Sequence, residues 1–209
     1  SIKFALFLVG EVLERELCGK IERIGLSGTR LSFNHLVKNQ SENFNVGDLD
    51  QQSVASFLMG WLEKQIDFTS ILAVGHRVVH GMKHTEPELV SSLLLDELYS
   101  ILPYDPDHMP SEIHLIEAFI RHHPMLPQIA CFDTAFHQDM PRVAKLLAIP
   151  RRFEEKGVQR YGFHGLSYSY LIEELAKLDE TNPNAGRIIL AHLGNGASMA
   201  AVHNGKSID

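Results

Sequence analysis

The sequence has few cysteines, and it lacks the common spacings of zinc ligands. Cys18 and Cys131 each lie among apolar residues, which favours two buried thiols in a reducing compartment over a disulfide. No paired-cysteine motif and no His-Glu-x-x-His motif occurs, although the chain has 12 histidines. A structural zinc site is therefore not expected.

Long hydrophobic runs and an excess of basic residues are also missing. No apolar run approaches the roughly 18–20 residues that a membrane span needs. The opening Ser1-Ile2-Lys3-Phe4 has neither the basic region nor the cleavage pattern of a secretory signal. The net charge of −7 argues against nucleic acid, because phosphate backbones are bound by clustered Lys and Arg. We therefore expect a cytoplasmic protein that binds neither membranes nor nucleic acid.

What remains is an ordinary globular composition over 209 residues, with 44% hydrophobic and 22% charged residues. Apolar runs predict strands over residues 2–9, 70–74, 128–132, 187–190 and 197–202, with further short strands within 11–35. Helical spacing predicts helices over 54–66, 91–101, 111–122 and 166–177, the first capped by Asp50 or Ser53. Strands that first cluster and then alternate with helices predict an α/β fold with a mixed sheet.

Two late segments predict the domain organisation. Residues 179–186 contain two Asn and a Pro and form the best linker candidate. The Asn204-Gly205 turn then predicts a β-hairpin near the end of the chain. A two-stranded hairpin is marginally stable alone. We therefore expect a domain over 1–180 and the first hairpin of a second, truncated domain over 187–209.

Three predicted strands end at polar residues, where α/β sheets bind their ligands. Arg77, in Gly-His-Arg-Val-Val-His-Gly, offers a planar fork of donors for a carboxylate or phosphate, or it forms a structural ion pair. Asp133 could orient a metal or nucleophile, or cap the next helix. The segment His192-Leu193-Gly194-Asn195-Gly196 could bring backbone N–H groups to a phosphate, or simply make a hairpin turn.

A fourth candidate is His164, which stands between glycines at a predicted helix start in Tyr-Gly-Phe-His-Gly. Such a histidine could stabilise developing negative charge. From local physics alone, the sequence indicates an α/β protein with an anion-binding cleft.

The motifs taken together are more specific than any one of them. Residues 75–81, 132–137, 161–165 and 192–198 occur in the order and approximate spacing of the acetate kinase family, and residues 204–209 continue the pattern. Residues 1–4 resemble the end of that family's amino-terminal phosphate loop. The chain thus resembles the amino-terminal half of an acetate kinase.

This resemblance implies an actin-like, sugar-kinase-like fold and transfer of a phosphoryl group between ATP and a short carboxylate, with Mg²⁺. By position, Arg77 would bind the carboxylate, Asp133 would be the catalytic carboxylate, and His164 would stabilise the transition state. Val79 and Phe163 would line the acyl pocket. The groups that would hold the ATP phosphates are Lys3, His192, Leu193, Gly194, Asn195 and Gly196.

The chain also departs from the family's pattern. The family has an Asn and a Gly-Ser-Ser stretch before the position of Ser1, and roughly as many residues again after Asp209. Those parts supply the adenine pocket, the main magnesium ligands, a second catalytic arginine and most of the homodimer interface. We therefore expect the 209 residues alone to be inactive. A rival interpretation is a stand-alone remnant that binds small anions or a partner protein without turnover.

One departure lies within the chain. The family's Ala-Pro-Leu-His-Asn-Pro segment corresponds to residues 105–110, where Asp107 takes the place of an apolar residue of the acyl pocket. If Asp107 points inward, it would admit a polar group on the substrate.

Overall fold

A computed structural model describes residues 1–178 and 186–209. It divides the chain into two compact units, unit 1 with residues 1–70 and 117–124 and unit 2 with residues 71–116 and 125–209. Helix α3 (Met109–His122) begins in unit 2 and ends in unit 1. The expected linker lies outside the described residues except for residue 186, and the domain division at 180/187 stays a prediction.

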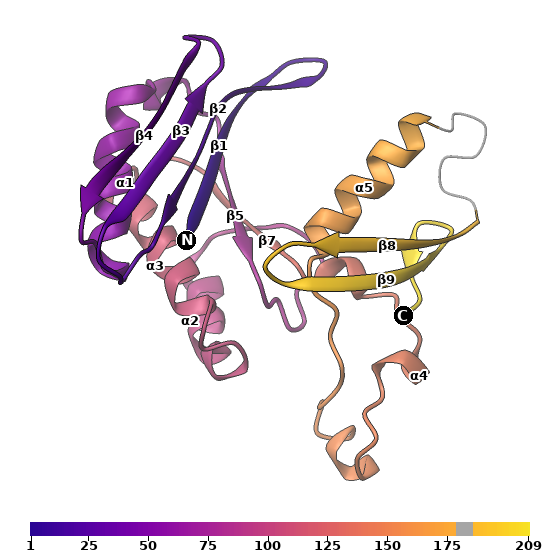
Figure 1. The fold of residues 1–209 in the computed structure, drawn as a ribbon. Helices are drawn as coiled ribbons and strands as arrows, with labels where there is room; N and C mark the ends of the chain where they lie inside the picture. Colours follow the sequence, from indigo (N-terminus) through magenta and orange to yellow (C-terminus); the bar gives the residue numbers. More distant parts are fainter. Residues whose placement is uncertain (179–185) are drawn as a thin grey trace. The chain divides into compact units, whose positions relative to one another are not determined.

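Unit 1 is a four-stranded antiparallel sheet with a helix on one face (Figure 1). Its strands pair in chain order, β1 (Ile2–Val9), β2 (Leu13–Glu22), β3 (Thr29–His35) and β4 (Gln40–Gly47). Helix α1 (Gln51–Gln65) begins at Asp50, whose side chain accepts from the backbone N–H of Ser53 at 2.8 Å, as the capping pattern predicted. Trp61 of α1 packs on Phe33 of β3, with ring centroids 4.9 Å apart.

Unit 2 contains two three-stranded sheets. The first is mixed, with order β5-β7-β6, and its strands are β5 (Val74–Val78), β6 (Glu88–Leu89) and β7 (Gln128–Phe132). Strand β5 runs parallel to β7, so both strands present their carboxyl ends at one edge. Buried side chains of α2 (Ser92–Ser100) and of the first half of α3 contribute to the core of this unit.

The second sheet of unit 2 is antiparallel, with β8 (Arg187–Leu193) and β10 (Lys206–Ser207) flanking β9 (Ala197–His203). Helix α5 (Gly165–Leu178) packs on it around Tyr168, Leu190 and Val202. The turn between β9 and β10 has positive φ at both Asn204 (51°) and Gly205 (75°), as the hairpin signal predicted. Shorter elements are η1 (Phe68–Ser70), η2 (Leu102–Tyr104), η3 (Ala135–His137), α4 (Arg142–Lys145) and η4 (Arg151–Phe153).

The mixed α/β class and most elements agree with the sequence analysis, but the strand expected over residues 70–74 is wrong. The strand is β5, which begins at Val74 and continues through the polar residues that were expected to follow it. It can do so because the buried His76 bonds Gln128 of β7, with Nε2 and Oε1 2.8 Å apart. Strand β4 was not foreseen.

Two smaller expectations also change. Strand β1 was expected to be buried, but half-buried and exposed residues alternate along most of it. Both cysteines are free, as expected, yet each is only half-buried. Among the described residues, no helix is long and apolar enough to cross a bilayer.

Candidate active site

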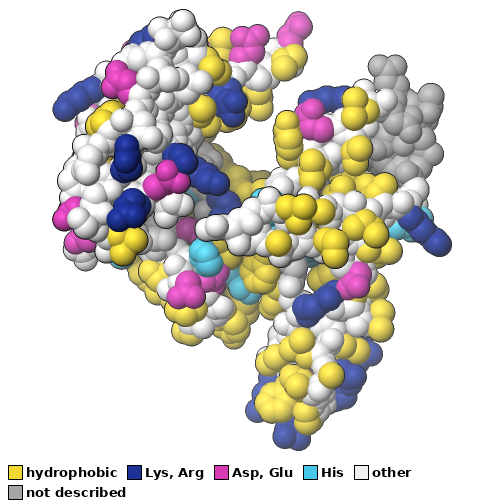
Figure 2. All heavy atoms as spheres, viewed as in Figure 1, with side chains coloured by type: hydrophobic (Ala, Val, Ile, Leu, Met, Phe, Trp, Pro, Cys, Tyr) yellow, Lys and Arg dark blue, Asp and Glu magenta, His cyan; other side chains and the backbone are white. Residues whose placement is uncertain are grey.

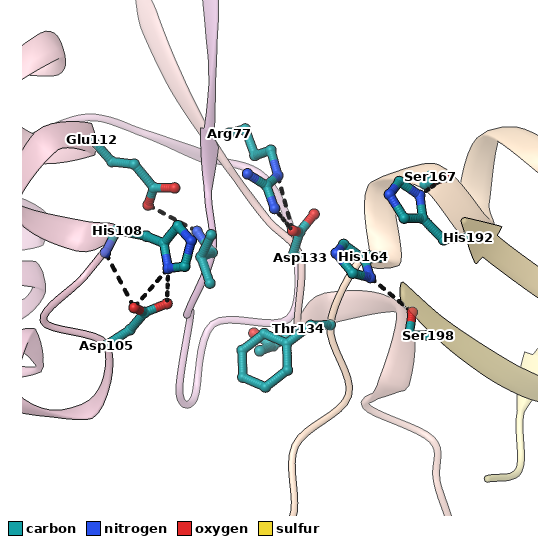
Figure 3. Close-up of polar contacts among 12 residues, drawn as sticks. Arg77, Asp105, His108, Glu112, Asp133, Thr134, His164, Ser167, His192 and Ser198 are labelled. Carbon is teal, nitrogen blue, oxygen red and sulfur yellow. Dashed lines mark hydrogen bonds and ion pairs between the residues drawn. The ribbon is translucent and has the colours of Figure 1, made fainter. Parts of the chain in front are cut away.

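Arg77 and Asp133 meet at the carboxyl edge of the parallel strands in unit 2 (Figure 3). The Arg77 Nη2 and Nε atoms donate to Asp133 Oδ2 at 2.5 and 2.9 Å. The Asp133 side chain is 1% exposed, whereas that of Arg77 is 51% exposed. Arg77 therefore satisfies a buried carboxylate while keeping part of its guanidinium accessible to another anion.

The main chain holds Asp133 from two sides. Its N–H donates to the Val78 carbonyl at 3.0 Å, and its carbonyl accepts from the N–H of Gly165, also at 3.0 Å. A Cβ on Gly165 would lie 2.1 Å from the Asp133 carbonyl oxygen, so only glycine allows α5 to begin this close. The following turn, η3, has Thr134 at its N-cap position without a side-chain capping bond. The alternative that Asp133 caps the next helix is therefore wrong.

His164 precedes α5 in the left-handed backbone region, with φ of 58°, which is uncommon outside glycine. The segment before it is fixed by His137, whose Nε2 lies 3.1 Å from the Phe163 carbonyl oxygen and whose Nδ1 lies 2.8 Å from Ser207 Oγ. Since a carbonyl can only accept, His137 carries its proton on Nε2 and accepts from Ser207. A Cβ on Gly162 would meet the His137 ring at 2.3 Å.

The His164 ring lies in an electrostatically mixed environment. Its Nδ1 is 2.7 Å from Ser198 Oγ, and its other edge points toward Asp133 (Figure 3). Burial lowers the pKa of His164, and the nearby His192 and Arg77 lower it further, while Asp133 opposes them. The neutral imidazole is therefore the favoured form.

His192 and the glycine turn lie against His164. The two imidazole rings stack with centroids 4.1 Å apart and an interplanar angle of 15°, and Ser167 Oγ lies 3.1 Å from His192 Nδ1. In the turn, the N–H of Gly194 donates to the carbonyl of Gly196 at 3.1 Å. A Cβ on Gly196 would come within 3.5 Å of His164 Nε2, so the turn passes close to the catalytic candidate.

The two residues expected to line the acyl pocket differ in exposure. Val79 is 6% exposed, and its N–H donates to Glu112 Oε2 of α3 at 2.9 Å. Phe163 is 37% exposed, and its ring packs edge-on to His80 at 5.5 Å. Burial is the main cause that raises the pKa of Glu112 to about 7, against the Val79 bond and the Arg77 charge.

The role of Asp107 in the acyl pocket stays a prediction. Asp107 is exposed, whereas Asp105 is half-buried and accepts from the backbone N–H of His108 at 3.2 Å. Ring Nδ1 of His108 lies 2.9 Å from the same Asp105 oxygen. The side chain that reaches the strand at Val79 is Glu112.

Lys3 lies on β1 in unit 1. It lines an open concavity of about 630 Å³ with Arg15, Lys20, Phe4 and Phe33. Figure 2 shows several Lys and Arg side chains on this unit, with Asp and Glu side chains among them. Basic groups on an apolar floor are compatible with an anion, and the phosphate role of Lys3 stays a prediction.

No metal centre is found within the described residues, where no three His, Cys, Asp or Glu side chains cluster. In unit 2, the buried Asp133 carboxylate is of a type that binds magnesium, but its Oδ2 already accepts hydrogen bonds from Arg77. These observations are compatible with a magnesium ion that is bound mainly by groups outside the described residues.

Contacts thus connect most of the sequence candidates in unit 2. Arg77 bonds Asp133, the Asp133 carbonyl accepts from the N–H of the residue after His164, and His164 stacks on His192 and lies near the glycine turn. Leu193, 82% exposed, ends β8 before that turn. Sequence reasoning missed His137, Ser167, Tyr168 and Glu112; for Tyr168, its spacing of four residues from His164 on a helix was the available signal.

Comparison with known proteins places this arrangement in context. The model of the acetokinase family matches residues 1–209. An acetate kinase of Rhizobium meliloti is 38% identical over 100% of this chain and 54% of its own length. One from Methylocella silvestris is 43% identical over 72% of this chain and 37% of its own.

Solved structures agree with these sequence relatives. A propionate kinase from Francisella tularensis superposes with a TM-score of 0.86 at 31% identity, covering 99% of this chain and 53% of that one. Porphyromonas gingivalis acetate kinase gives 0.83 at 30% identity, covering 99% and 54%. The fold therefore matches the amino-terminal half of these kinases, which confirms the actin-like expectation. The chain spans about half the length of its relatives.

Proposed function

Because this chain belongs to the acetokinase family, we propose that the protein carrying it transfers the γ-phosphoryl group of ATP to a short-chain carboxylate, giving an acyl phosphate and ADP. The observation that carries the proposal is the half-exposed Arg77 guanidinium, held on the buried Asp133 beside His164. The 209 residues alone are expected to be inactive, since family members hold ATP with groups from beyond this half.

In this proposal the reacting carboxylate binds Arg77, and one of its oxygens attacks the γ-phosphorus as the bond to the ADP oxygen breaks. Phosphoryl transfer depends mostly on positioning and charge neutralisation. His164 would donate a hydrogen bond to the transferring group, whose oxygens carry the developing charge. Asp133 keeps Arg77 in place and supplies the catalytic carboxylate.

The remaining residues would bind the rest of the substrates. Val79 and Phe163 would contact the acyl chain and favour a short one. Lys3 and the turn at Gly194–Gly196 would hold ATP phosphates through an ammonium and backbone N–H groups. Mg²⁺, bound mainly by groups outside this chain, would neutralise phosphate charge.

The test is an assay of the complete protein with ATP, Mg²⁺ and acetate, propionate, butyrate or a hydroxy acid, with the acyl phosphate trapped as its hydroxamate. Turnover is expected, and Arg77→Lys should raise KM for the carboxylate more than KM for ATP, because lysine lacks the two-pronged geometry. Absence of acyl phosphate with all four acids would favour the anion-binding remnant. Equal kcat/KM values for all four would mean that Val79 and Phe163 do not select the acyl group.

A further inference from the structure

Tyr168 stands at the end of a hydrogen-bonded chain that leads to His164. Its side chain is fully buried in α5, and its hydroxyl oxygen lies 2.5 Å from Ser198 Oγ of β9. The same Ser198 oxygen lies 2.7 Å from His164 Nδ1 (Figure 3). The start of α5 and strand β9 are therefore joined by one line of hydrogen bonds through three side chains.

One arrangement of the protons gives both hydroxyl groups an acceptor within the described residues. Within residues 1–178 and 186–209, Ser198 is the hydrogen-bond partner found for the Tyr168 hydroxyl. A buried hydroxyl that donates to nothing costs roughly 1–3 kcal/mol. Tyr168 therefore donates to Ser198, and Ser198 donates to His164 Nδ1. A neutral imidazole that accepts at Nδ1 carries its proton on Nε2.

The reverse arrangement is less favourable. If His164 donated from Nδ1 to Ser198 and Ser198 donated to Tyr168, the Tyr168 proton would be left without an acceptor. If Ser198 instead accepted from both His164 and Tyr168, its own proton would have no acceptor among the hydrogen bonds of the described residues. The stacked His192 ring also covers one face of the His164 imidazole and limits its rotation. The hydrogen-bonded geometry thus selects one tautomer of His164.

We propose that Tyr168 is a positioning residue that acts through Ser198 to hold the His164 proton on Nε2, the ring edge that faces Asp133 and the Gly194–Gly196 turn. An Nε2–H can donate to an oxygen of a transferring phosphoryl group, whereas a lone pair at that atom would repel it. This consequence for turnover rests on the proposed function. The tautomer itself does not.

The tautomer is measured by long-range ¹H–¹⁵N correlation spectra of histidine-labelled protein, with His164→Asn used to identify the His164 signals. In the natural protein we expect a protonated Nε2 and an unprotonated Nδ1. Tyr168→Phe keeps the ring in the core around Leu190 and Val202 but removes the first donor, so mixed tautomers are expected. The matched control is Tyr170→Phe, two residues further along α5 and 60% exposed, which should leave the spectrum unchanged.

Turnover gives the second readout. Tyr168→Phe is expected to lower kcat by roughly tenfold, the scale at which outer hydrogen-bond partners act, with smaller changes in KM. Ser198→Ala should shift the tautomer in the same way and replaces Tyr168→Phe if that variant does not fold. A proton on Nδ1 in the natural protein, or an unchanged tautomer in both variants, overturns the proposal. A shifted tautomer with unchanged kcat would confirm the hydrogen-bond chain and contradict the catalytic role of His164.

Discussion

Asp133 is the residue in which burial and function are most closely coupled. Its side chain is 1% exposed, and Arg77 compensates its charge from a half-exposed position. Removing a buried charge usually leaves its partner uncompensated, but here water can solvate the partner. The main-chain bonds to Val78 and Gly165 also persist when the side chain changes.

We therefore predict that Asp133→Asn lowers kcat by roughly 100-fold or more, in the range of a lost transition-state contact, while the thermal midpoint changes little. Steady-state kinetics and a melting curve of the complete protein check both parts. Asn keeps the size of the side chain and could still accept a bond from Arg77, so charge is what the substitution removes. Near-normal kcat in the Asn variant would show that Asp133 is only structural.

Alanine substitutions at two glycines are expected to change the free energy of unfolding in opposite directions. Gly165→Ala places a Cβ 2.1 Å from the Asp133 carbonyl oxygen and 2.8 Å from Phe136 Cβ, so the backbone must move. We predict a loss of roughly 1–3 kcal/mol in unfolding free energy, together with reduced activity. Gly60→Ala, inside α1 with nothing within 4 Å of the added atom, should instead stabilise by up to about 1 kcal/mol. Urea denaturation of both variants checks the signs, and equal effects would contradict the close approach.

At the scale of elements, the sequence predicts regular pieces well and interactions between them poorly. Helix α1 and strand β7 could be read directly, because apolar spacing and the Asp50 cap are local signals. Strand β4, with sequence Gln-Ser-Glu-Asn-Phe-Asn-Val-Gly, is mostly exposed and has no apolar run to mark it. Its pairing with β3 supplies what its own residues do not indicate.

In the candidate site, too, the sequence predicted the residues but not the contacts between distant segments. The positions of Arg77, Asp133, His164 and the glycine turn followed from motifs in register. Their partners did not, because Tyr168 and Ser198 are 30 residues apart and meet only when α5 packs on β9. The role of His137 likewise depends on Ser207, 70 residues away.

Ser207 and His137 connect strand β10 to the candidate site. Ser207 is fully buried and donates to His137, which in turn donates to the Phe163 carbonyl just before His164. We predict that Ser207→Ala costs roughly 1–3 kcal/mol in unfolding free energy, because it leaves His137 Nδ1 buried without a donor. Chemical denaturation is the measurement, with Ser41→Ala on exposed β4 as a control expected within about 0.5 kcal/mol of the parent. Equal stability of the two variants would contradict the attachment.

At the scale of the whole molecule, three buried histidines and the half-buried Glu112 in unit 2 make stability depend on pH in opposite directions. Burial lowers the pKa of His76 to about 4 and also lowers the pKa of His80 and of His137. Unfolding lets these histidines bind protons, so their contribution is present above pH 6.5 and is lost as pH falls toward 4. Glu112 acts oppositely: its pKa is raised to about 7, so the folded state holds a proton that the unfolded state releases above about 4.5.

The substitution Glu112→Gln separates the contribution of Glu112 to the pH dependence from that of the histidines. Above pH 7 the half-buried Glu112 must be charged in the folded protein, at a cost on the order of 3 kcal/mol, since each pKa unit corresponds to about 1.4 kcal/mol. Glu112→Gln removes that charge and keeps an acceptor for the Val79 N–H, so the variant should be more stable than the parent at pH 8 and equally stable at pH 4.5. Urea denaturation at the two pH values, with the exposed Glu155→Gln as control, provides the measurement. If the variant gains nothing at pH 8, water reaches the Glu112 carboxylate, and the histidines alone set the pH dependence of unit 2.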